Sequence, residues 1–101
     1  MKTLPNAVRG ALERLLEIAQ RDTGQSRRVA DFLLAWWNAG QCGGFDFTNM
    51  WSCDQEITDD MLTVLRWVAN NPHYPDVLGY GEQFEAVVAA WRPELLQKGS
   101  Q

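Results

Sequence analysis

Residues 26–47 read SRRVADFLLAWWNAGQCGGFDF, and the rest of the chain can be placed around this run. Its apolar residues recur at helical spacing and form a wide face: Val29, Phe32, Leu33 and Trp36. We predict a helix over about 27–39, with Ser26 as its N-cap and Gly40 as the residue that ends it. Because few polar residues interrupt it, this helix is expected at the centre of a bundle, in contact with more than one neighbour.

The segments on either side of this run show the same helical periodicity. Three further helices are predicted over about 5–22, 53–70 and 80–92. The expected fold is therefore an all-α, single-domain bundle of about four helices over residues 1–101, with a frayed tail at 97–101.

An aromatic, glycine-rich loop from Gly40 to Ser52 is expected between the second and third helices, folded across one end of the bundle. Phe45 and Phe47 are two residues apart, so in an extended stretch they point the same way and are expected to close over the core. Ser52 and Gln55 have the spacing of a capping box, which predicts the start of the third helix.

Charge and composition narrow the classes of function. The 101 residues include nine basic and thirteen acidic side chains, with a net charge of −4 and a pI of about 4.8, which argues against a broad nucleic-acid-binding footprint. Neither a signal-peptide core nor an apolar run long enough to cross a bilayer is found. We expect a cytoplasmic protein without a membrane partner.

Catalytic and metal-binding patterns are weak. The two cysteines, Cys42 and Cys53, are expected to be reduced in the cytosol, and a reversible disulfide between them is the alternative. They and the single histidine, His73, lack the paired spacings of a zinc site. No sequence around His73 resembles a hydrolase motif. We expect no catalytic residues, no metal and no cofactor.

Three segments of the chain resemble an uncharacterised family of small bacterial proteins encoded on integrative and conjugative elements. They read DTGQSRRVADFLLAWWNAGQCGGFDF (22–47), DQEITDDM (54–61) and YPDVLGYGEQFE (74–85). The resemblance implies an accessory protein of a mobile genetic element with a protein partner, and no established activity.

The leading hypothesis for function is a non-enzymatic protein-interaction or regulatory module. Between residues 45 and 60 the chain has five acids, no basic residue and several aromatic residues. We predict a partner-binding face that contains Trp51, Asp54, Asp59 and Asp60 and meets a protein with a basic surface. The alternative is that core packing accounts for the aromatic residues and helix-dipole complementarity for the acids.

Two other functions remain open from the sequence. In a nucleic-acid-associated protein, Arg21, Arg27 and Arg28 would contact phosphates near the turn between the first two helices. An enzyme would need His73, or a carboxylate pair such as Asp46 and Asp54, in a well-formed pocket.

Overall fold

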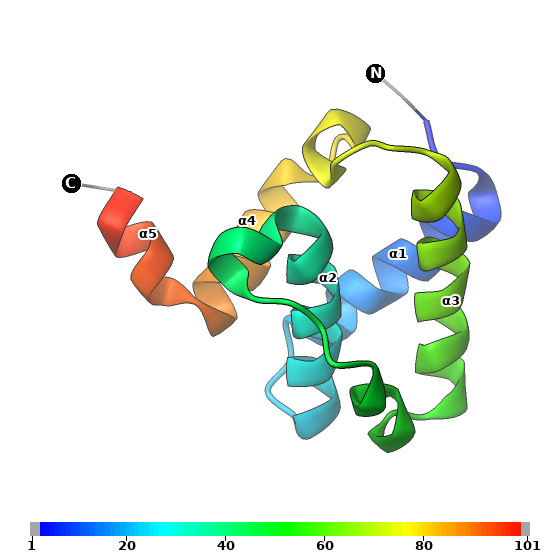
Figure 1. The fold of residues 1–101 in the computed structure, drawn as a ribbon, viewed down its shortest axis with the longest axis horizontal. Coiled ribbons are helices and arrows are strands. Elements are labelled where there is room, and N and C mark those ends of the chain that lie inside the picture. The colour runs from blue at the N-terminus through cyan, green and yellow to red at the C-terminus, as the bar shows by residue number, and fades with distance from the viewer. Residues whose placement is uncertain (1–2, 100–101) are drawn as a thin grey trace.

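The computed structural model describes residues 3–99, and these form helices and short connections without a β-strand (Figure 1). In order the elements are α1 Asn6–Ala19, α2 Gly24–Cys42, η1 Phe47–Ser52, α3 Gln55–Asn70, η2 Pro75–Leu78, α4 Gly81–Trp91 and α5 Pro93–Gly99, where η marks a 3-10 helix. The predicted all-α bundle is confirmed.

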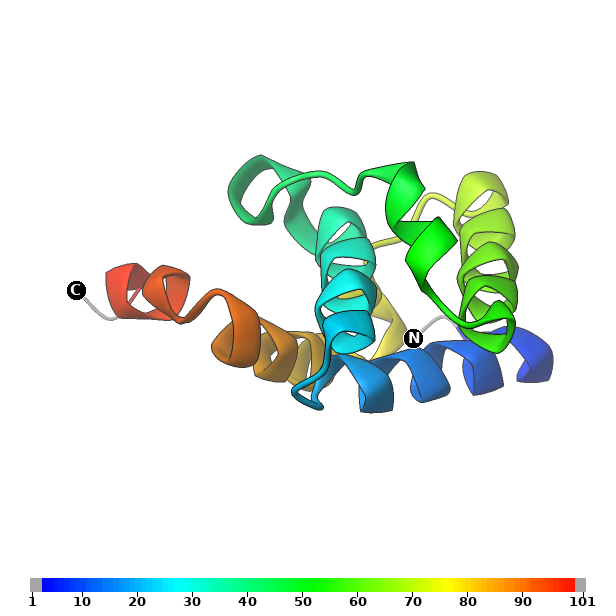
Figure 2. The same cartoon turned by 90° about the horizontal axis from the view of Figure 1, so that it is seen from below.

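The helices form two layers, with α1 and α4 along the base and α2 and α3 standing across α1 (Figure 2). α1 contacts α2, α3 and α4, and α2 contacts α1, α4 and η1, so the expectation that the second helix has several neighbours is confirmed. Their apolar stripes meet in one core, whose fully buried side chains include Leu12, Leu15, Leu33, Met61, Val64 and Phe84. α5 extends away from this body at the end of α4.

The predicted N-cap of the second helix is wrong. Thr23, in extended conformation, caps α2, and its Oγ1 accepts from the backbone N–H of Ser26 at 3.0 Å. The Ser26 hydroxyl, completely buried, lies 2.7 Å from the Thr23 hydroxyl. α1 correspondingly ends at Ala19, earlier than the predicted 22, because the residues that follow form the turn into this cap.

The predicted end of the second helix at Gly40 is also wrong. Helical geometry breaks at Asn38, whose φ is −167° and ψ is 79°, and a further helical turn then runs to Cys42. The Asn38 side chain starts that turn, since its Oδ1 accepts from the backbone N–H of Gln41 at 3.3 Å. Gly43, with a φ of 96°, ends it in a conformation that side chains disfavour.

The capping box that the sequence predicts before α3 does not form. Ser52 belongs to η1, and the N-cap of α3 is Asp54, which makes no side-chain bond to its own helix. Gln25 of α2 binds Asp54 instead: its Oε1 accepts from the Asp54 backbone N–H at 2.7 Å, and its Nε2 donates to the carboxylate at 3.3 Å. This contact joins the starts of α2 and α3.

The last part of the chain follows the prediction closely. α4 spans Gly81–Trp91 against a predicted 80–92. Arg92, between α4 and α5, binds α2 at two positions: its guanidinium donates to the Asp31 carboxylate at 2.7 Å and to the Cys42 carbonyl at 3.1 Å. Of the tail predicted to fray, residues 97–99 belong to α5, and residues 100 and 101 lie outside the described part.

Tyr80 connects the start of α4 to α1, and this contact gives stability a pH dependence. Its hydroxyl donates to Glu13 Oε2 at 2.9 Å, and burial together with this bond raises the pKa of Tyr80 to about 12. The pKa of Tyr80 in the folded protein lies above its ordinary value of about 10. The stabilisation by the Tyr80–Glu13 hydrogen bond is therefore complete below about pH 10 and is lost as the pH rises through about 12.

We therefore expect Tyr80→Phe to lower the free energy of unfolding by about 1 kcal/mol at pH 9, the usual value for such a hydrogen bond. The difference from wild type should vanish near pH 12. Denaturant unfolding of both proteins across this range checks it. A difference in the free energy of unfolding that stays constant with pH would contradict the assignment of this pH dependence to the Tyr80 hydroxyl.

Within residues 3–99, no helix has both the length and the apolar character that crossing a bilayer requires.

Candidate protein-binding groove

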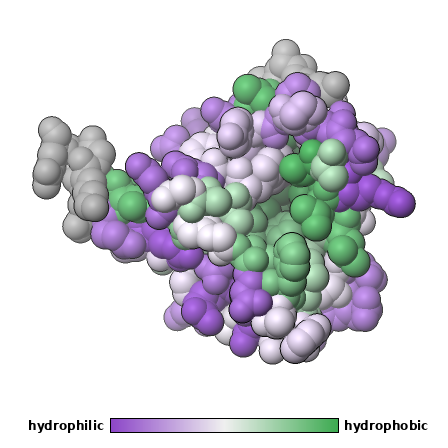
Figure 3. Space-filling view, viewed as in Figure 1, coloured by the Kyte–Doolittle hydropathy of each residue, from purple (hydrophilic) through white to green (hydrophobic). Residues whose placement is uncertain are grey.

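An open groove of about 970 Å³ lies between four parts of the chain: α2, α3, the segment at the start of η1 and the segment at the start of η2. On the face of the molecule that Figure 3 shows, hydrophobic residues gather in the region of the groove. Most of its lining side chains are aromatic or aliphatic: Phe32, Trp36, Trp37, Phe45, Phe47, Val64, Leu65, Val68 and Tyr74. The groove therefore has the composition of the buried centre of a protein interface.

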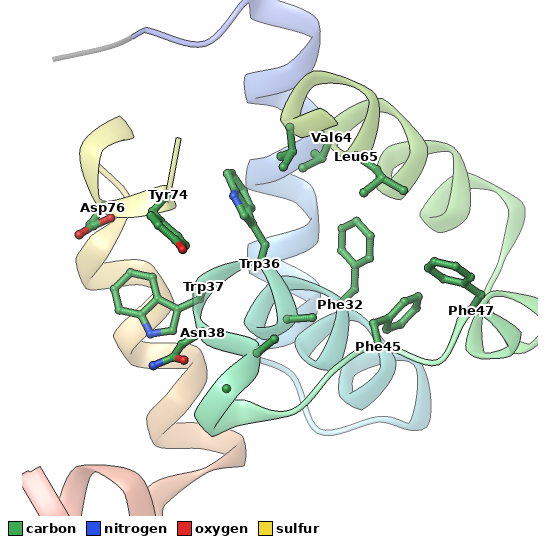
Figure 4. A pocket seen from close by; sticks show the side chains of 14 residues that line it. Phe32, Trp36, Trp37, Asn38, Phe45, Phe47, Val64, Leu65, Tyr74 and Asp76 are labelled. Carbon is green, nitrogen blue, oxygen red and sulfur yellow. The ribbon is translucent and has the colours of Figure 1, made fainter. Parts of the chain in front are cut away.

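Phenylalanine and leucine side chains form one end of the groove (Figure 4). Phe45 packs edge-on against Phe32, with ring centroids 5.3 Å apart, so it covers the core as expected. Phe47 does not, since its side chain is 71% exposed. It starts η1, which is capped by Asp46: the Asp46 carboxylate accepts from Thr48 N–H at 2.9 Å, and this bond lowers the pKa of Asp46.

Trp36 and Trp37 line the other end. Both indole rings pack against the Phe84 ring. Phe84 is completely buried. Trp37 stacks on it at 5.6 Å between ring centroids with 20° between planes, whereas Trp36 meets it edge-on at 5.7 Å and 88°. The Trp36 indole N–H also donates to the His73 carbonyl at 3.0 Å. Both indoles are thus held in defined orientations.

Tyr74 and Asp76 complete this end of the groove from the segment between α3 and α4. Between them, Pro75 is buried and attaches the segment to the core. Tyr74 is 65% exposed, and Asp76 is also exposed. Asp76 is the sole charged residue of the groove lining among residues 3–99.

A family model described as a family of unknown function (DUF7673) matches residues 9–92. The chain belongs to this family. Comparisons with curated proteins and with solved structures gave no match. The matched span covers most of α1, all of α2 to α4 and the whole groove lining, whereas α5 lies beyond it. The resemblance to an uncharacterised family is confirmed to this extent.

The four residues of the predicted partner-binding face lie on η1 and at the start of α3, outside the groove lining. Trp51 is the most exposed large apolar side chain among residues 3–99, at 85%. Asp54 and Asp59 are exposed, although Asp54 is bound to Gln25 and Asp59 accepts from Gln55 Nε2 at 2.8 Å.

The fourth residue, Asp60, has a different role. Its carboxylate accepts two hydrogen bonds from the Arg14 guanidinium, both at 2.9 Å, and its side chain is only 16% exposed. This bidentate pair connects α3 to α1 and raises the pKa of Arg14. Asp60 therefore contributes less free charge to the surface than the sequence pattern suggests.

The arginines of the nucleic-acid alternative are only partly available for phosphate contacts. Arg21 forms an ion pair with Glu17 at 2.7 Å, and Arg28 donates to the Gly24 carbonyl at 3.1 Å. Arg27 is exposed, and no hydrogen bond or ion pair involves its side chain within residues 3–99.

Features for chemistry are few in the part of the chain that the structure describes. Cys42 and Cys53 are both free thiols, and burial raises the pKa of each, which disfavours the reactive thiolate. No group of three His, Cys, Asp or Glu side chains comes together to hold a metal ion within residues 3–99.

Sequence reasoning placed the aromatic surface on the loop but missed the groove behind it. One signal was present: the apolar stripe of α3 is wider than one packed face needs. Ile57, Met61 and Val64 are buried, whereas Leu65, which continues the same apolar pattern, is 40% exposed at the groove edge. The contribution of Tyr74 and Asp76 has no periodic signal, because they lie at the start of η2, a 3-10 helix of four residues that is too short to show a repeat.

Proposed function

We propose that this protein is a non-enzymatic interaction module that binds a segment of a protein partner in the groove. The observation that carries the proposal is the set of large apolar side chains left exposed around it: Phe47, Leu65 and Tyr74 in its lining and Trp51 on the adjoining η1. Covering such side chains is favourable by about 25 cal/mol per Å² of apolar surface. Contiguous exposed apolar surface of this kind typically marks an interaction site.

The preorganisation of the lining supports binding over a purely structural role. Phe84 packs against Trp36 and Trp37, and Trp36 also donates to the His73 carbonyl. Because these two side chains are already restrained, they lose little conformational entropy when a partner docks. Trp51, Asp54 and Asp59 would contribute an aromatic and acidic rim beside the Phe47 end, which suits a partner with a basic surface.

The biological setting of the proposal rests on the sequence resemblance. A small accessory or regulatory protein of a bacterial mobile genetic element, acting in the cytoplasm, would use such a module to engage a protein of the element or of its host. Membership in a family without known activity is compatible with this setting.

Selection from a random peptide library displayed on phage tests the proposed function. Immobilised wild-type protein should enrich peptides that share spaced apolar residues, because the groove offers several apolar subsites. Trp51→Ala should weaken the binding of those peptides if the rim takes part. Failure to enrich any sequence above an unrelated helical protein would contradict the proposal.

The nucleic-acid alternative is supported by Arg27, which is exposed and, unlike Arg21 and Arg28, makes no side-chain hydrogen bond or ion pair within residues 3–99. It requires binding to DNA or RNA that weakens steeply with salt and is lost in Arg27→Ala. That result, without peptide enrichment, would replace the interaction module as the better proposal.

A further inference from the structure

Three aromatic side chains and one carboxylate lie at the same end of the groove (Figure 4). Trp36 and Trp37 come from α2, and Tyr74 and Asp76 come from the segment that precedes α4. Because one face of the Trp37 ring is stacked on Phe84, the remaining surface of the ring lines the groove. The Tyr74 ring approaches the two indoles from the opposite segment.

The electrostatic character of this end is negative. Among the described residues that line the groove there is no lysine, arginine or histidine, and Asp76 supplies the one full charge. No hydrogen bond or ion pair within residues 3–99 involves the Asp76 carboxylate. The ring faces of tryptophan and tyrosine add the negative side of their quadrupoles. A positive group therefore has both a counter-charge and π surfaces here.

We propose that this end of the groove binds the guanidinium group of an arginine in the partner segment. A guanidinium is planar and weakly hydrated, so it stacks on aromatic faces better than an ammonium and pairs with a carboxylate through two parallel hydrogen bonds. Trp36, Trp37 and Tyr74 supply the faces, and Asp76 supplies the carboxylate.

This inference rests on the proposed function and specifies the recognised partner. The phenylalanine end, with Phe32, Phe45 and Phe47, takes an apolar residue of the same segment, and the Asp76 end takes the arginine. The partner is then a protein segment that combines an apolar anchor with an arginine. Its positive charge also matches the acidic residues from 54 to 60, which lie in the sequence between the lining residues Phe47 and Val64.

Nuclear magnetic resonance titration with Nα-acetyl-arginine methylamide tests the arginine site directly. The probe should shift the indole N–H signals of Trp36 and Trp37, while that of Trp91, whose N–H is bound to the Ala19 carbonyl outside the groove, should stay unchanged. The citrulline counterpart has nearly the same shape without the charge. It should bind about tenfold more weakly, because it loses both the ion pair and the cation–π contact.

Two variants and a matched control locate the site. Asp76→Asn should weaken arginine binding about fivefold, the upper range for an exposed ion pair, and Tyr74→Leu should weaken it while keeping apolar contact. Asp22→Asn removes one negative charge from an exposed residue that lies outside both the groove and its acidic rim, and should leave the affinity unchanged.

The inference is overturned if citrulline binds as tightly as arginine, or if Asp76→Asn binds arginine as well as Asp22→Asn does. Tighter binding of Nα-acetyl-trimethyllysine methylamide would overturn the choice of a guanidinium. If selected peptides occupy the groove without an arginine, the inference fails and the interaction module stands. If the arginine probe binds and no peptide is enriched, the interaction module fails.

Discussion

Replacing Phe84 with alanine should lower the free energy of unfolding by about 3–5 kcal/mol, the usual cost of removing a buried phenylalanine. The ring is completely buried and contacts both Trp36 and Trp37, so its loss leaves a cavity beneath the groove. Domains of this size have about 5–15 kcal/mol of stability, so the variant should lose a large part of its margin. Guanidinium unfolding followed by circular dichroism measures the change.

Two other substitutions, one at the next residue and one at Phe84 itself, serve as controls for Phe84→Ala. Glu85→Ala, at an exposed position of the same helix, should change stability by less than about 0.5 kcal/mol. Phe84→Leu keeps apolar volume and should cost less than the alanine variant. The near-ultraviolet signal of the stacked Trp37 should weaken in both Phe84 variants. If the free energy of unfolding of Phe84→Ala lies within about 0.5 kcal/mol of the wild-type value, Phe84 is not the shared support of the two indoles.

The number and placement of the helices could be predicted from the sequence because apolar residues at helical spacing identify a buried face. In α1, for example, Val8, Leu12 and Leu15 recur at helical spacing and are buried. The ends of the helices were less predictable, since several residues in one stretch can cap. Thr23 and Ser26 both have capping hydroxyls, and only the extended backbone of Thr23 decides between them.

Long-range contacts explain the other differences. Ser52 and Gln55 have the right spacing for a capping box, but Gln25, 29 residues away in sequence from Asp54, binds the N-cap instead. Asp60 looks like a free acid in an acidic run, yet Arg14 of α1 holds its carboxylate. Neither partner can be identified from local sequence patterns.

The candidate site was predictable only in part for the same reason. The exposure of Trp51 fits the predicted aromatic surface, because a 3-10 turn on a loop has no second layer to cover it. The groove joins residues from 32 to 76 and depends on the break at Asn38, which places the last turn of α2 along its edge. A break inside a helical pattern has no periodic signal.

The central claim is that the groove is the face where a protein partner binds. A double variant, Phe47→Ser with Leu65→Ser, removes two exposed apolar side chains from its lining without touching the buried core. Truncating two anchors of a binding site costs about 3 kcal/mol together, which is about a 100-fold loss of affinity. Leu62→Ser is the matched control, because Leu62 is 53% exposed on α3 and lies outside the groove.

Isothermal titration calorimetry with a peptide enriched on the wild-type protein measures this loss most directly. We expect the double variant to bind about 100-fold more weakly than wild type and Leu62→Ser to bind as wild type does, with all three proteins folded by circular dichroism. Equal affinity of the double variant and the wild type would show that the peptide binds elsewhere, and would contradict the assignment of the groove as the binding face.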